Sequence, residues 1–149
     1  MRTARRSNHT AVDRLRAICL ALPEATEKIA WGEPTWRVRG KLFAQLDDHH
    51  HGADHLAVWL PAPLGEQEAM VFTDPERFFR PPYVGPRGWV GVRIDRRPSW
   101  PQVATLVERA YRMVAPPRLL GSLVTIRPLR TSKPSRTRRR SRTSRQRSR

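Results

Sequence analysis

The stretch WGEPTWRVRGKLFA, from Trp31 to Ala44, contains the pattern that decides the fold of this chain. Within it, Trp36 and Val38 fall on one face of an alternating segment, and Arg37 and Arg39 fall on the other. Such alternation is typical of a strand with one buried face. We therefore expect both tryptophans of the stretch, together with the valine, in the core and the arginines on the surface.

A tight turn follows this first strand. Gly40 tolerates the positive φ of such a turn, Lys41 completes it, and residues 42–47 are predicted to return as the partner strand. A two-residue turn at this point sets Val38 opposite Phe43. The stretch is therefore predicted to form a β-hairpin with a basic tip.

Helical patterns flank the hairpin on both sides. Apolar residues at helical spacing predict a helix over residues 11–22, preceded by a capping box of Thr10 and Asp13 and ended by a proline. A second amphipathic helix is predicted over residues 100–114, with Ser99 as its cap. These two helices are the expected cover of the sheet.

Between hairpin and closing helix, the pattern predicts further strands and short connections. Alternating apolar residues indicate strands over residues 55–60 and 89–94. Short helices are expected at 65–71 and, after a Thr-Asp-Pro-Glu start signal, at 77–79. Residues 80–88 are rich in proline and glycine and predict a structured loop.

Charge is distributed unevenly along the chain. The 149 residues carry a formal net charge of +16, and residues 127–149 hold eleven of the 29 Lys and Arg residues with no Asp or Glu. Leu129 is the one large apolar residue of that end, too little for a core, so the segment is predicted to be disordered. The predicted organisation is a disordered basic N-terminus over 1–9, one α+β domain over 10–122, and a disordered Arg/Ser-rich tail over 127–149.

The single cysteine and the short apolar runs bear on the setting of the protein. Cys19 falls on the apolar face of the first predicted helix, where we expect a buried thiol rather than a nucleophile. No apolar run approaches the ~20 residues that span a bilayer, and the basic start is not followed by the apolar segment of a signal peptide. These features predict a soluble protein that is not exported and does not contact a membrane.

A polar loop, DDHHHGADH over residues 47–55, holds four histidines and three aspartates. Imidazole and carboxylate are zinc ligands, but adjacent histidines in a loop do not set the geometry of a metal site. Asp47, Asp48 and Asp54 lie near histidines, yet a mobile loop preorganises acid–base chemistry poorly. With no Gly-rich phosphate loop or nucleophile elbow in the sequence, we predict no enzyme activity, no catalytic residue, no cofactor and no metal site.

Three segments resemble the MmcQ/YjbR family: LALPEATEKIAWGEPTWRVRGKLFA at 20–44, TDPERFFRPPYVGPRGWVGVRID at 73–95, and AYRMVAPPRLL at 110–120. The resemblance extends over roughly residues 11–120. It implies a CyaY-like α+β domain, a two-layer sandwich in which N- and C-terminal helices cover an antiparallel sheet. It also implies DNA binding, the label that members of this family usually carry. The histidine loop and the arginine tail depart from the family pattern.

The leading hypothesis is therefore a non-enzymatic DNA-binding protein, located in the cytoplasm or there at the nucleoid, that contacts phosphates without sequence specificity. An arginine- and serine-rich tail does not distinguish DNA from RNA. The candidate contact residues are Arg37, Arg39, Lys41, Arg80, Arg87 and Arg93 in the domain and Arg136, Arg138, Arg139, Arg140 and Arg142 in the tail. The competing interpretation of the hairpin tip is a solvated turn with ordinary surface charges.

The alternative hypothesis is a module that binds a protein or a small ligand. In it, Trp59, Tyr83 and Trp89 line an aromatic groove beside the proline loop. Against it stands the interpretation that the five tryptophans fill the core of a small domain. The oligomeric state stays open at this point.

Overall fold

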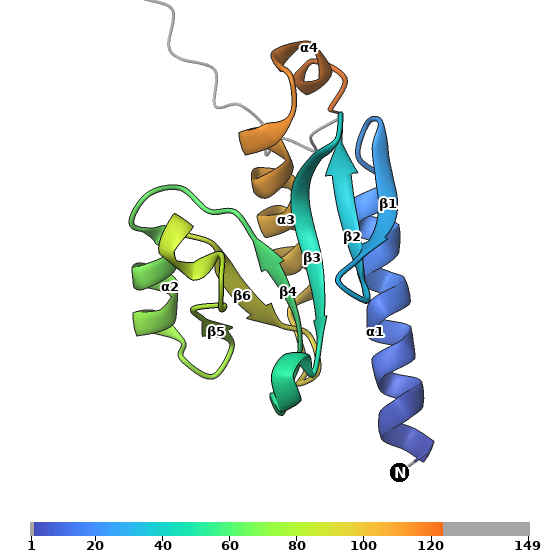
Figure 1. Ribbon diagram of the computed structural model, residues 1–149, viewed down its shortest axis with the longest axis vertical. Helices are drawn as coiled ribbons and strands as arrows, with labels where there is room; N and C mark the ends of the chain where they lie inside the picture. The colour runs from blue at the N-terminus through green and yellow to red at the C-terminus, as the bar shows by residue number, and fades with distance from the viewer. Residues whose placement is uncertain (1, 124–149) are drawn as a thin grey trace, which may run out of the picture.

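The computed structural model describes residues 2–123, in which six antiparallel strands form one sheet (Figure 1). The strands are β1 (Ala25–Ala30), β2 (Glu33–Val38), β3 (Lys41–Asp48), β4 (Leu56–Leu60), β5 (Phe78–Phe79) and β6 (Val90–Arg93), in the order β1-β2-β3-β4-β6-β5. The helices are α1 (Arg2–Leu20), α2 (Glu66–Thr73), α3 (Trp100–Val114) and α4 (Pro117–Leu120). The predicted α+β class is confirmed, and the predicted disordered tail over 127–149 lies outside the described residues.

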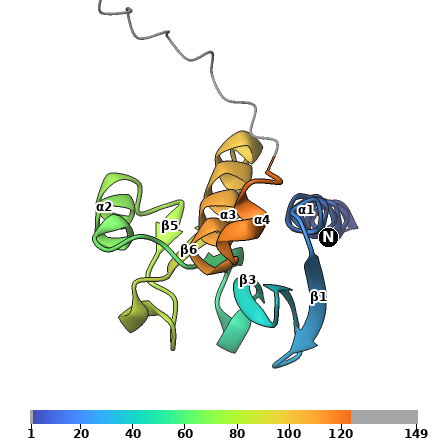
Figure 2. The same cartoon turned by 90° about the horizontal axis from the view of Figure 1, so that it is seen from above.

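Helices α1 and α3 lie on the same side of the sheet, and α2 lies beside β5 (Figures 1 and 2). The core forms between the sheet and helices α1 and α3. Leu15 and Cys19 of α1 are fully buried there. Trp36 and Val38 are fully buried there too, as their alternation predicts. Burial of each large apolar side chain contributes roughly 1.5–3 kcal/mol, so this layer supplies the main stabilisation of the fold. No helix within residues 2–123 is long and apolar enough to cross a membrane.

Helix α1 begins at Arg2 rather than near residue 11, so residues 2–9 are helical and not unstructured as predicted. The Thr10 hydroxyl donates a hydrogen bond of 2.8 Å to the Arg6 carbonyl, one turn back in the helix. Because Thr10 lies inside the helix, it does not act as the predicted cap. His9 and Asp13, 3.0 Å apart on successive turns, add a local contact to this exposed extension.

The central hairpin forms, but its turn differs from the prediction by one residue. Arg39 and Gly40 occupy the turn, with φ of 52° and 77°, whereas Gly40 and Lys41 were expected there. Two consecutive residues with positive φ match the twist of the flanking strands. Val38 consequently lies opposite Lys41 and not opposite Phe43.

The pairing of β2 with β3 then shifts by one residue. Arg37 pairs with Leu42 and Trp36 pairs with Ala44, which leaves Phe43 as the extra residue of a bulge in β3. Phe43 and Ala44 are both fully buried although they are neighbours in a strand. The Phe43 ring meets the Tyr111 ring of α3 edge-on at 5.4 Å, so the bulge lets β3 bury consecutive side chains.

The edge strand β1 was not expected, since residues 25–29 were predicted only to lead into the sheet. A second two-residue turn, Trp31 and Gly32 with φ of 52° and 77°, connects β1 to β2. This position places Trp31 outside the core with 70% of its surface exposed, which corrects the prediction for that tryptophan. The recurring residue-glycine pair was the signal for this turn.

The segment predicted as a short helix at 77–79 is the strand β5. Phe79 pairs with Gly91 of β6, and a Cβ on that glycine would lie 2.3 Å from the Phe79 ring. The glycine therefore makes room for the phenylalanine, and β5 can add to the sheet. Strands β4 and β6 and helix α3 agree with the prediction, and Ser99 caps α3 by accepting a hydrogen bond from the Gln102 amide at 3.4 Å.

Candidate nucleic-acid interface

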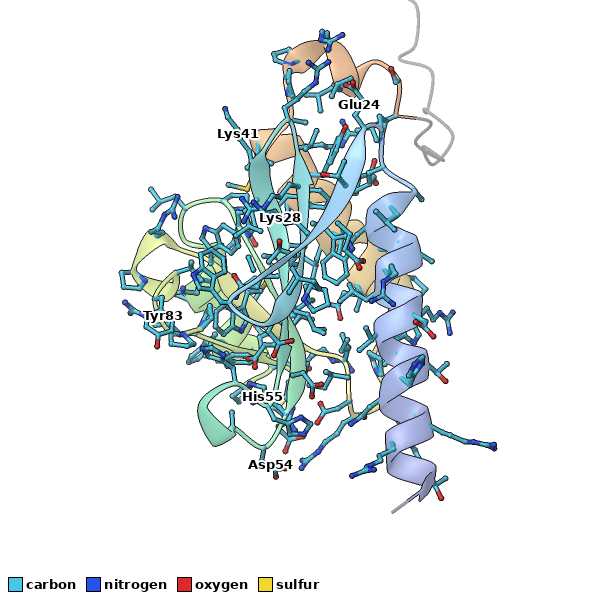
Figure 3. All side chains as sticks on the ribbon, turned by 45° about the vertical axis from the view of Figure 1, so that its right-hand side comes forward. Glu24, Lys28, Lys41, Asp54, His55 and Tyr83 are labelled. Carbon is cyan, nitrogen blue, oxygen red and sulfur yellow. The ribbon has the colours of Figure 1, made fainter. Side chains whose placement is uncertain are left out.

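The basic residues predicted to touch phosphates do not lie together. Lys41 begins β3, whereas Arg93 pairs with Ala57 of β4, which in turn pairs with Asp47 near the other end of β3. In Figure 3, Lys41 lies at the top of the sheet, and Asp54, whose carbonyl bonds to Arg93, lies at the bottom. One nucleic-acid segment lying on the hairpin tip would therefore not meet Arg93.

Arg39 of the hairpin turn forms an ion pair with Glu24. Its guanidinium lies 3.1 Å from the Glu24 carboxylate, and both side chains are about half exposed. Arg118 of α4 approaches the same carboxylate at 3.8 Å. A phosphate at Arg39 must compete with this carboxylate, so Arg39 is a weaker attractor of phosphate than its sequence context implies.

Arg93 is held in a second ion pair, with Asp95. The guanidinium lies 3.1 Å from the carboxylate and donates a further hydrogen bond of 3.2 Å to the Asp54 carbonyl. The hydrogen bond to Asp95 raises the pKa of Arg93. Burial opposes ionisation of Asp95, but the hydrogen bond and charge of Arg93 act together with two backbone hydrogen bonds and lower the pKa of Asp95. Only 19% of the arginine side chain is exposed, so Arg93 serves the fold here.

Arg37 is half-buried on β2. One guanidinium nitrogen donates to the Gly40 carbonyl at 3.3 Å and thereby braces the hairpin turn. Its Nε is buried without a hydrogen-bond partner among residues 2–123. The side chain is thus partly committed to the turn.

Lys41, Arg80 and Arg87 remain available. All three are exposed, and none forms an ion pair with another residue in the described part of the chain. Arg80 and Arg87 line one open cleft of about 650 Å³, beside Gly85. The tail candidates Arg136, Arg138, Arg139, Arg140 and Arg142 lie outside the described residues.

The histidine segment is better ordered than a polar loop would be, because Asp47 belongs to β3. Only 2% of the Asp47 side chain is exposed, and its carboxylate accepts hydrogen bonds of 2.9 Å from the His50 amide, His55 Nε2 and Trp59 Nε1. The prediction that Asp47 lies in a mobile loop is therefore wrong. Within residues 2–123, no group of three or more His, Cys, Asp or Glu side chains is placed to hold a metal ion.

An open cavity of about 600 Å³ lies on the sheet face opposite α1 and α3. Its position follows from the alternation of side chains, because the neighbours Leu46 and Val58 point into the core while Gln45 and Trp59 point away from it. The side chains that give it chemistry are Trp31, Gln45, His50, Trp59, Tyr83 and Arg87. Figure 3 shows Tyr83 at the edge of this face.

Aromatic rings and one amide shape the cavity. The His50 ring meets both Trp59 and Tyr83 edge-on, with centroids 5.4 and 6.1 Å apart. Of the predicted aromatic groove, Trp59 and Tyr83 come together, but Trp89 is buried elsewhere, with its carbonyl bonded to Gln67. Sequence reasoning missed Trp31 and Gln45, and the turn glycine after Trp31 was the one available signal.

Comparisons with known proteins agree on a family and a fold. The family model described as YjbR matches residues 20–113. A crystal structure of the Deinococcus radiodurans protein DR2400, described with the domain DUF419, superposes with a TM-score of 0.60 at 21% sequence identity, covering 69% of this chain and 77% of that one. At this identity the likeness shows the fold alone. No curated protein matches the sequence.

Proposed function

The chain belongs to the YjbR family, and from that premise we propose that it is a non-enzymatic DNA-binding protein that holds phosphates without reading sequence. The observation that carries the proposal is the segregation of charge. Residues 127–149 combine eleven Lys or Arg residues with no Asp or Glu, while residues 1–126 hold 18 basic and 13 acidic side chains. A dense cationic segment joined to a nearly balanced domain favours an anionic polymer as partner.

Within the domain, the proposal assigns phosphate contacts to Lys41, Arg80 and Arg87. These side chains are exposed and are not neutralised by acids within residues 2–123, in contrast to Arg39 and Arg93. A phosphate near an already paired arginine must compete with the carboxylate that holds it. We therefore rank the three unpaired residues above the two paired ones.

Salt dependence tests the electrostatic part of the proposal. Binding through about eight phosphate contacts gives a slope near roughly −7 in a plot of log affinity against log salt. Fluorescence anisotropy with a labelled duplex should show this slope for the full chain and a much shallower one after deletion of 127–149. Absence of duplex binding at low salt would contradict the proposal. A slope that the deletion leaves unchanged would show that residues 127–149 make no phosphate contacts.

Charge reversal tests the domain. The triple variant Lys41→Glu, Arg80→Glu and Arg87→Glu, made in the protein without residues 127–149, should bind the duplex at least tenfold more weakly. The matched control reverses Lys28, Arg96 and Arg97, which are also exposed and form no ion pair among the described residues. Equal losses in both variants would show a general charge effect and refute the assigned contacts.

The proposal places the protein in the cytoplasm, at the nucleoid, where duplex DNA is the abundant anion. Competition at fixed salt between duplex DNA, single-stranded DNA and RNA of equal length tests this choice. Preferential displacement by RNA would move the assignment to RNA.

A further inference from the structure

Two large aromatic residues are held in an unusual backbone conformation at the open cavity. Trp31 and Tyr83 have φ of 52° and 60°, in the left-handed region that disfavours bulky side chains. They are also 70% and 69% exposed, so neither gains much from burial. The fold thus accepts strained backbone and solvated apolar surface at two separate loops, and both rings border one cavity.

A buried amide lies in the same cavity. Gln45 is 5% exposed, lines the cavity, and its side-chain amide forms no hydrogen bond with any residue in 2–123. No Gln45 atom is among the fully buried polar atoms that lack a partner in this described range, so the amide meets solvent through the cavity, and a ligand that displaces this water must replace its hydrogen bonds. By contrast, the neighbouring Trp59 indole is satisfied by Asp47. Gln45 therefore offers a donor and an acceptor to a ligand that enters the cavity.

Positive charge borders the cavity at one side. Arg87 lines it and also lines the adjacent cleft that contains Arg80. Neither arginine is paired with an acid among the described residues, although the exposed Glu68 also lines that cleft. A ligand with an anionic group beside its ring system would find complementary charge there.

From these contacts we infer that the cavity binds an unpaired nucleobase, with its phosphate on Arg87 and Arg80. Trp31 and Tyr83 supply ring faces for stacking, and the Gln45 amide meets the hydrogen-bonding edge of the base. The inference rests on the proposed function, because a bound nucleic acid is the first source of such a base. A free nucleotide is a second source with the same chemistry. Bases inside a duplex cannot stack on protein rings, so the ligand is a single-stranded or displaced base.

A purely apolar ligand fits the cavity less well. It would leave the Gln45 amide unsatisfied and would make no use of the arginines at the border. A volume of about 600 Å³ falls within the range of small-ligand sites and accommodates one base with its sugar. The occupant is therefore defined by three features together: a planar ring system, a polar edge and an adjacent anion.

The test uses the full chain and a short single-stranded oligonucleotide with one central 2-aminopurine, whose fluorescence is quenched by stacking. Binding should quench the probe, and Trp31→Asn, Tyr83→Asn and Gln45→Leu should each weaken the quenched complex about tenfold. Asparagine tolerates the left-handed backbone, so the first two variants keep their turns. Phe72→Asn, which removes an exposed ring outside the cavity, is the matched control and should change nothing.

Two competitors identify the chemistry and its source. Adenosine monophosphate should relieve the quenching, whereas ribose 5-phosphate, which lacks the base, should not. A free nucleotide that binds as tightly as the oligonucleotide supports the inference with the nucleotide itself as ligand. Equal competition by ribose 5-phosphate overturns base recognition.

Failure of this inference can be separated from failure of the proposed function. Undiminished quenching in all three cavity variants, or no quenching at all, overturns the inference, even when anisotropy shows duplex binding by the same protein. The opposite outcome is also distinct. If the cavity variants lose the quenching and the protein has no affinity for duplex DNA, the proposed function is refuted and base binding in the cavity is supported. Urea unfolding of each variant confirms that a lost signal reflects the site and not the fold.

Discussion

Trp59 Nε1 donates a hydrogen bond of 2.9 Å to Asp47 Oδ2, which ties the floor of the aromatic cavity to a buried carboxylate at the end of β3. The same carboxylate accepts hydrogen bonds of 2.9 Å from the His50 amide and from Nε2 of His55. It therefore sets the position of the histidine segment and of the cavity together. An acid that looked like part of a polar loop is instead a structural centre of this end of the sheet.

Replacement of Asp47 by alanine should lower the free energy of unfolding by about 3 kcal/mol, because buried donors lose their acceptor. Urea denaturation of the full chain measures this loss. Asp48→Ala, at the exposed neighbour, is the control and should change stability by no more than about 0.5 kcal/mol. Equal stability of the two variants would contradict the structural role of Asp47.

The Cys19 thiol should be unreactive in the folded protein. It is fully buried, and burial raises its pKa far above the usual range, so the nucleophilic thiolate is scarce at neutral pH. Labelling with iodoacetamide, followed by mass spectrometry, should proceed only in urea concentrations that unfold the chain. Rapid labelling of the native protein would show that the first helix opens locally.

Gly91→Ala should destabilise the protein by about 1–3 kcal/mol, because the added Cβ meets the Phe79 ring at 2.3 Å. The double variant with Phe79→Leu should recover part of this loss, since a smaller side chain relieves the collision. Thermal or urea unfolding of the single and double variants measures the coupling. Strictly additive losses would show that the two residues do not compete for the same space.

The Arg93–Asp95 pair should give a distinct pH dependence. The pKa of Asp95 is lowered in the folded state, so its contribution to stability is present above the unfolded pKa and is lost as pH falls through the folded value. In Arg93→Met, burial and the backbone hydrogen bonds at Asp95 and Leu56 remain, and the pKa of Asp95 should rise from its lowered value because the guanidinium is gone. The loss of stability on acidification should therefore be smaller in the variant than in the wild-type protein.

Carboxyl-carbon NMR of the wild-type protein and of Arg93→Met follows this titration directly. An Asp95 pKa that stays low without Arg93 would show that backbone hydrogen bonds hold the charge. Duplex binding of the same variant should change little, because Arg93 is already neutralised by its partner.

Local patterns were sufficient for most of the elements. Alternation identified β2, β4 and β6, and a cap with helical spacing identified α3, because these signals depend on neighbours in the chain. The turn between β2 and β3 was misplaced by one residue, since Arg39 adopts a positive φ that is ordinarily left to glycine. Helix α1 was predicted too short because polar residues at its start show no apolar period.

The sequence by itself determined the α+β class, the family resemblance and the concentration of positive charge in residues 127–149. Only the tertiary structure decided which charges are available, because Glu24, in the connection between α1 and β1, pairs with Arg39 of the hairpin turn. It also decided that Trp31 and Tyr83, from separate loops, border one cavity with Gln45. Periodicity is a local property of the chain, whereas ion pairing and shared cavities depend on strand register and packing, which sequence patterns do not specify.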